Sequence, residues 1–89
     1  MSIVNDHPVN AVAVHNSAGK LFFEDGKIDR AIHSFRQALK FSETAEASTQ
    51  LTVDIKLNLA NGLSAKGEAD KALKIYDDLL KTKILKHLY

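Results

Sequence analysis

The chain has 89 residues, of which 45% are hydrophobic and 26% charged, with a formal net charge of +1 and no cysteine. This length and composition are typical of one small globular domain, and the low net charge does not favour a nucleic-acid or membrane surface as a partner. The absence of cysteine excludes disulfides, thiol nucleophiles and cysteine-based metal sites.

The first half of the chain predicts two helices joined by a tight turn. We expect the first helix over residues 8–25, with Asp6 as its cap and Pro8 in the first turn, where a missing N–H costs little. Gly26 supplies the left-handed backbone that lets the chain turn back. A second helix is predicted over residues 28–41, because its apolar side chains recur every three to four positions.

The third element carries two conflicting signals. Residues 42–49 are small and polar and predict a connector, and the following stretch LTVDIKLNL, residues 51–59, alternates apolar and polar side chains as a half-buried strand does. We predict a helix for this stretch, because no second strand is available to pair with it. On a helical wheel its apolar residues cover about two-thirds of the circumference, which is typical of a buried helix.

The last helix is predicted from residues 68–70 to the end of the chain. Its expected inner stripe consists of Ala72, Leu73, Tyr76, Leu79 and Leu80. The helix ends in further apolar residues with no following helix to cover them: Ile84, Leu85, Leu88 and Tyr89. We therefore expect self-association through this helix, because an uncovered apolar surface indicates a missing partner.

An internal repeat supports this assignment of helices. Residues 26–39, GKIDRAIHSFRQAL, return 41 residues later as residues 67–80, GEADKALKIYDDLL. A repeat of this length predicts stacked helical hairpins. We therefore predict a single all-α domain over residues 1–89, a four-helix antiparallel array of two hairpins. Repeat one covers residues 8–41, the connector 42–49 and repeat two 50–89.

The repeated pattern resembles the tetratricopeptide repeat (TPR). Each copy has a small residue midway along its first helix, a large apolar residue one turn later, a glycine turn, and a small residue and an aromatic on its second helix. These are Gly19, Phe22, Gly26, Ala31 and Phe35 in repeat one and Ala60, Leu63, Gly67, Ala72 and Tyr76 in repeat two. Two departures are a period longer than the usual value of about 34 residues, and His15 and Lys56 in place of the family's aromatic.

The resemblance implies a fragment of a right-handed superhelix whose first helices line a groove for a partner. The residues expected to face this groove are Asn16, Lys20, Phe23 and Glu24 in repeat one and Asp54, Asn58 and Asn61 in repeat two. The helical wheel independently leaves the same sector of repeat two without large apolar groups. Ordinary solvent-exposed polar residues would give the same pattern.

The sequence offers little for catalysis or metal binding. The four histidines lack metal-ligand spacing, and we expect His15 to pack in the place of the family's aromatic. Asp77 and Asp78 are adjacent, so they point about 100° apart on a helix and suit a solvated face better than a catalytic pair. We expect no enzyme activity, no metal and no cofactor.

Three functions are open at this point. The leading hypothesis is a protein–protein interaction module that binds a peptide or helix of a partner in the groove. The alternative is a self-assembling scaffold unit that works as a homo-oligomer, and the third is nucleic-acid contact through Lys81, Lys83 and Lys86. No secretory signal or long apolar run is found, so we expect a cytoplasmic protein without a membrane segment.

Overall fold

The chain is folded entirely into helices over the residues that the computed structural model describes, 8–45 and 47–88, with side chains for 10–45 and 47–83. The helices are α1 (Pro8–Glu24), α2 (Ile28–Thr44), α3 (Thr49–Lys66) and α4 (Ala69–Leu88). The predicted all-α fold is confirmed, and residues 51–59 lie inside α3 rather than in a strand. The predicted cap Asp6 lies outside the described residues.

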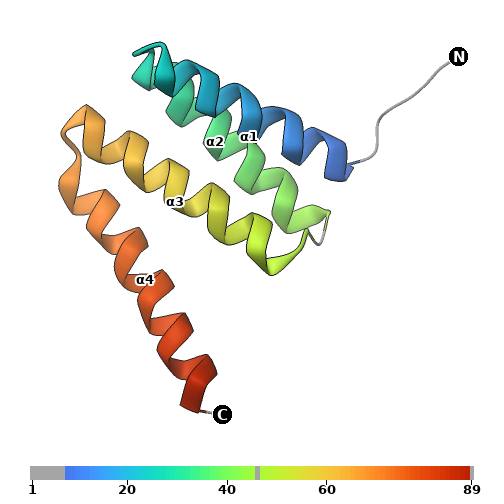
Figure 1. Cartoon of the computed structure of the whole chain (residues 1–89), viewed down its shortest axis with the longest axis vertical. Coiled ribbons are helices and arrows are strands. Elements are labelled where there is room, and N and C mark those ends of the chain that lie inside the picture. The colour runs from blue at the N-terminus through green and yellow to red at the C-terminus, as the bar shows by residue number, and fades with distance from the viewer. Residues whose placement is uncertain (1–7, 46, 89) are drawn as a thin grey trace, which may run out of the picture.

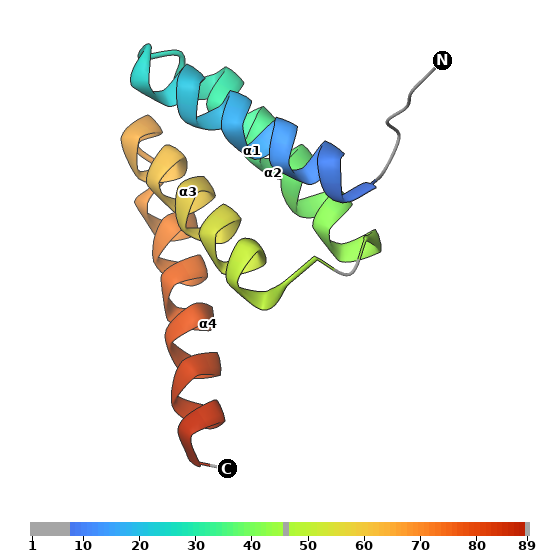
Figure 2. The same ribbon diagram turned by 45° about the vertical axis from the view of Figure 1, so that its right-hand side comes forward.

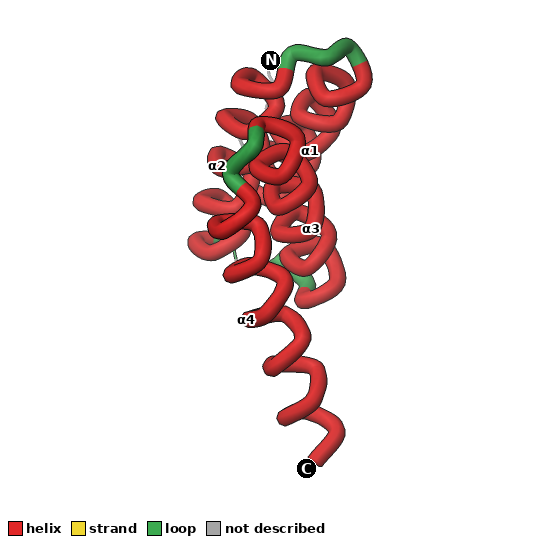
Figure 3. Tube along the Cα trace, turned by 90° about the vertical axis from the view of Figure 1, so that its left-hand side faces the viewer, coloured by secondary structure: helices red, strands yellow, loops and turns green. Residues whose placement is uncertain are grey.

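The helices form two hairpins, α1–α2 and α3–α4, laid side by side (Figure 1). Figure 3 shows α1 and α3 on one side of the molecule, with α2 and the first part of α4 on the other. The result is a slab of 47 × 37 × 16 Å. Within the described residues α3 contacts all three other helices, whereas α4 packs on α3 alone. The first helices of the two hairpins therefore share one face.

The 41-residue repeat extends to single backbone hydrogen bonds in the two hairpin turns. Gly26 and Gly67 have φ angles of 80° and 96°, the left-handed conformation that glycine adopts without a Cβ penalty. The residue after each glycine closes the turn, with the N–H of Lys27 donating to Phe22 O at 2.9 Å and that of Glu68 to Leu63 O at 2.8 Å. Both turns are thus the same helix-ending motif.

Phe35 of α2 lies where three helices meet. A Cβ added at Gly19 of α1 would come within 2.4 Å of Phe35 Cε1, and one added at Gly62 of α3 would be 4.0 Å from Phe35 Cδ2. The close crossing predicted at Gly19 therefore exists, but its partner is the ring of Phe35 rather than Ala31. The surrounding core cluster consists of Ala31, Ile32, Phe35, Leu59, Ala60, Leu63 and Ala72.

The connector between the hairpins is shorter than predicted. Helix α2 continues to Thr44 rather than Phe41, because the hydroxyl of buried Ser42 donates to the carbonyl of Leu39 at 2.7 Å and needs no water. Helix α3 begins at Thr49, with the Ser48 hydroxyl accepting from the N–H of Leu51 at 3.2 Å. The connector therefore spans residues 45–48, not 42–49.

The predicted inner stripe of α4 was partly wrong. Ala72 is buried and Tyr76 and Leu79 are half-buried, but Leu73 and Leu80 are 62% and 58% exposed. Ile75 packs against the core instead. Since α4 rests on α3 alone, its buried stripe is narrow, and Leu73 and Leu80 fall outside it.

Burial of α3 is also less complete than predicted, since Leu57 is 38% exposed. The side chains of Ile84, Leu85 and Leu88, and the whole of Tyr89, lie outside the described part of the structure. The predicted association through them stays a prediction.

Candidate functional site

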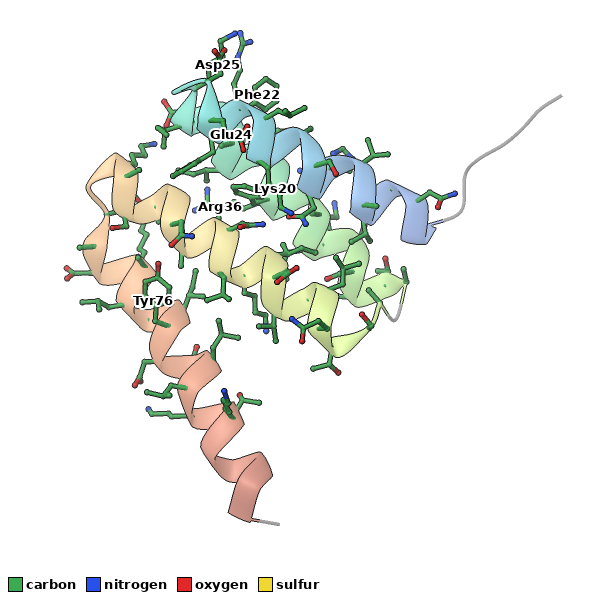
Figure 4. All side chains as sticks on the ribbon, viewed as in Figure 1. Lys20, Phe22, Glu24, Asp25, Arg36 and Tyr76 are labelled. Carbon is green, nitrogen blue, oxygen red and sulfur yellow. The ribbon has the colours of Figure 1, made fainter. Side chains whose placement is uncertain are left out.

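A hollow of about 200 Å³ lies between α1 and α3. It is lined by Lys20, Phe23, Glu24, Phe35, Asn58 and Asn61. Five of these six were expected at the groove from the sequence, and Figure 4 shows Lys20 in the space between the two helices. Residues 38 positions apart are therefore brought together here, because α1 and α3 are the equivalent helices of the two hairpins.

The hollow combines an apolar surface with polar groups from both helices. Phe35 is 2% exposed and contributes the buried part, whereas Phe23 is 36% exposed. Exposed Lys20 and Glu24 stand one turn apart on α1. An aliphatic or aromatic side chain could contact the two rings while its backbone meets polar groups at the rim.

Asn16 is not part of the lining. It is 6% exposed, and its Oδ1 accepts a hydrogen bond from Nδ2 of Asn58 at 3.1 Å. This bond joins α1 to α3 beside the hollow and orients the amide of Asn58. Asn16 is therefore a positioning residue, because its burial leaves it no free surface for a partner.

Tyr76 plays the same part for Asn61. Its hydroxyl donates from α4 to Oδ1 of Asn61 at 2.5 Å, and Figure 4 shows Tyr76 on α4. The repeat register placed Tyr76 in the core as the equivalent of Phe35, and its hydroxyl was the overlooked signal, since a partly buried phenol needs a polar partner. Asp54, one turn before Asn58, is exposed and does not line the hollow.

The ion pairs that join the hairpins lie away from the hollow. Lys66 Nζ at the end of α3 is 2.8 Å from Asp29 Oδ1 at the start of α2, and Glu68 Oε1 is 2.8 Å from Lys71 Nζ. The hydrogen bond with Asp29 raises the pKa of Lys66, and the hydrogen bond from Lys71 lowers the pKa of Glu68. These pairs are solvent-exposed, so they orient the hairpins more than they stabilise them.

A larger hollow of about 430 Å³ opens between the end of α1 and the start of α2. It is lined by Phe22, Asp29, Arg30, His33 and Ser34. Its carboxylate at Asp29 is already paired with Lys66. The smaller hollow is therefore the better candidate, because it joins both repeats and presents amide groups at its rim.

The described residues contain no group of three or more histidine, aspartate or glutamate side chains able to hold a metal ion. His15 stacks on Phe41, with ring centroids 5.4 Å apart and an interplanar angle of 4°. Its expected packing in place of an aromatic is confirmed.

Within the described part of the chain, no helix has both the length and the apolar character that crossing a membrane requires.

Comparison with protein-family models, with curated proteins and with solved structures gives no match for this chain. Its function therefore has to be argued from the geometry of the two hairpins and the hollow between them.

Proposed function

We propose that this protein is a non-catalytic interaction module, related to the tetratricopeptide repeats, that binds a peptide or helix of a partner protein in the groove between α1 and α3. The hollow at the centre of that groove supports the proposal most directly. At about 200 Å³ it is smaller than the pockets of about 300–1,000 Å³ that hold small molecules. It suits one side chain of a longer ligand.

The two asparagines give the groove a way to bind a peptide backbone of any sequence. The hydrogen bond to Asn16 uses Nδ2 of Asn58, and the bond from Tyr76 uses Oδ1 of Asn61. The oxygen of Asn58 remains to accept from a peptide N–H, and the amide group of Asn61 remains to donate to a peptide carbonyl. Three residues apart on α3, the two asparagines share one helix face.

The affinity should be modest. A net contribution of about 1 kcal/mol per hydrogen bond, with one apolar side chain in the hollow, corresponds to a dissociation constant in the micromolar range. Lys20 adds attraction for an acidic partner, which salt would screen.

The test is selection of random peptides on the immobilised protein, followed by calorimetric titration of the enriched sequences. Asn61→Ala combined with Phe23→Ala should weaken binding tenfold or more, because it removes one hydrogen bond and the apolar contact. Asn10→Ala, an exposed asparagine of α1 outside the hollow, is the matched control and should bind as wild type.

Two results would contradict the groove. One is binding that survives the double substitution but is lost when Lys81 and Lys83 are changed. The other is selection of no peptide at all, together with salt-dependent binding of an oligonucleotide, which would indicate nucleic-acid contact through the end of α4.

A further inference from the structure

Two apolar patches of the molecule are uncovered, one on each outer helix. Val14 and Leu21 form the α1 patch and are 64% and 67% exposed, and Leu73 and Leu80 form the α4 patch and are 62% and 58% exposed. The helices α2 and α3 separate α1 from α4 (Figures 1 and 2). The two patches therefore lie at opposite ends of the array.

The internal repeat identifies the kind of surface that the α4 patch is. Leu73 and Leu80 lie 41 residues after Ile32 and Leu39 of α2. Ile32 is only 4% exposed, because α3 covers it: a Cβ added at Gly62 would come within 3.0 Å of Ile32 Cγ1. The α4 patch thus repeats the part of α2 on which α3 lies.

The α1 patch repeats the other side of the same internal contact. Val14 and Leu21 lie 41 residues before Ile55 and Gly62, the residues of α3 that face α2, and Ile55 is completely buried. Leu21 follows Gly19, which contacts Phe35 of α2, by two positions, or about 200° around the helix. The α1 patch therefore faces away from its own hairpin, towards the place of a preceding one.

We propose that copies of this chain join head to tail, with the α1 patch of one copy on the α4 patch of the next, as α3 lies on α2 within one copy. The chain carries both halves of this contact, so a second copy is the occupant that the repeat specifies. The contact joins two different patches and leaves one of each free at the ends. Leu21 stands where α3 has Gly62, so the helices at this contact are more widely spaced, and the Leu21 side chain fills the added space beside Leu73.

This inference does not rest on the proposed binding of a peptide, because it uses other residues. The assembly would place the α1 of the next copy beside α3 and so repeat the α1–α3 groove at every contact between copies.

The test uses two variants, each with one patch blocked. One carries Val14→Glu and Leu21→Glu, and the other Leu73→Glu and Leu80→Glu. A control carries His33→Glu and Lys40→Glu, two exposed positions on the outer face of α2. Circular dichroism checks that each is folded, and sedimentation equilibrium measures mass from micromolar to millimolar concentration. If a glutamate pair prevents folding, alanines at the same two positions replace it and should weaken association at least fivefold.

The wild-type protein and the control should gain mass continuously with concentration. Each blocked variant alone should be a monomer, because every contact needs one patch of each kind, and an equimolar mixture of the two should form a species of two chains and no larger. A wild type that stays monomeric at millimolar concentration would overturn the proposal. So would a variant blocked on α1 that still dimerises, which would indicate pairing of α4 with α4 through the residues from Ile84 onwards, or a mixture that stays monomeric.

Discussion

Gly19→Ala offers a sharp test of how the two hairpins pack, because two physical effects of opposite sign act at this position. In a helix interior alanine is favoured over glycine by about 0.8–1.0 kcal/mol, so an unhindered change would stabilise the protein. The added Cβ, however, would come within 2.4 Å of Cε1 and 2.5 Å of Cδ1 of Phe35. That ring is 2% exposed and has no free space into which to move.

The expected net effect follows from these contacts. A separation of 2.4 Å is well inside the 3.4–4 Å of ordinary van der Waals contact. The overpacking cost should therefore lie near the upper end of its usual range, about 3 kcal/mol, and exceed the helix-propensity gain. We expect the free energy of unfolding to fall by about 2 kcal/mol, which is a large share of the stability of so small a domain.

Urea unfolding followed by circular dichroism measures this change. Gly62→Ala is the matched control: its Cβ would approach Ile32 Cγ1 only to 3.0 Å, so gain and clash nearly cancel and stability should change by less than about 0.5 kcal/mol. Adding Phe35→Leu to Gly19→Ala should relieve the clash, giving a coupling energy of about 1–2 kcal/mol in a double-mutant cycle. The reasoning is refuted if Gly19→Ala is as stable as the wild type.

Three further outcomes follow from the described contacts. Gly67→Ala places a side chain at a φ of 96° and should lower the free energy of unfolding by about 1 kcal/mol, and an unchanged urea midpoint would count against it. Lys71 lowers the pKa of Glu68, so the stability from ionised Glu68 is present above pH 4.5 and is lost as pH falls through the lowered pKa. Glu68→Gln should therefore make the melting temperature less dependent on pH below that value, and an equal dependence would reject the contact. Asn16→Ala should cost about 1–2 kcal/mol, because it removes the partner of the Asn58 amide; a variant as stable as wild type would show that this bond contributes nothing.

The sequence alone determined the helices and the turns between them. The glycines at 26 and 67 stand where the backbone needs a positive φ, and the repeat register assigned residues 51–59 to a helix despite their strand-like alternation. Five of the seven predicted groove residues also lie around one hollow. These features depend on short-range backbone preferences and on the spacing of side chains along one helix, both of which are properties of local sequence.

Only the tertiary structure decided which apolar and polar side chains are covered. Ile32 and Leu73 are equivalent in the repeat, yet the first is 4% and the second 62% exposed, because α3 lies on α2 and no helix of this chain lies on the corresponding face of α4. The pairing of Asn16 with Asn58 joins residues 42 positions apart and converts an expected ligand contact into a positioning bond. Burial and hydrogen-bond partners are set by neighbours distant in the sequence, so one helical pattern gives a core residue in one repeat and a surface residue in the next.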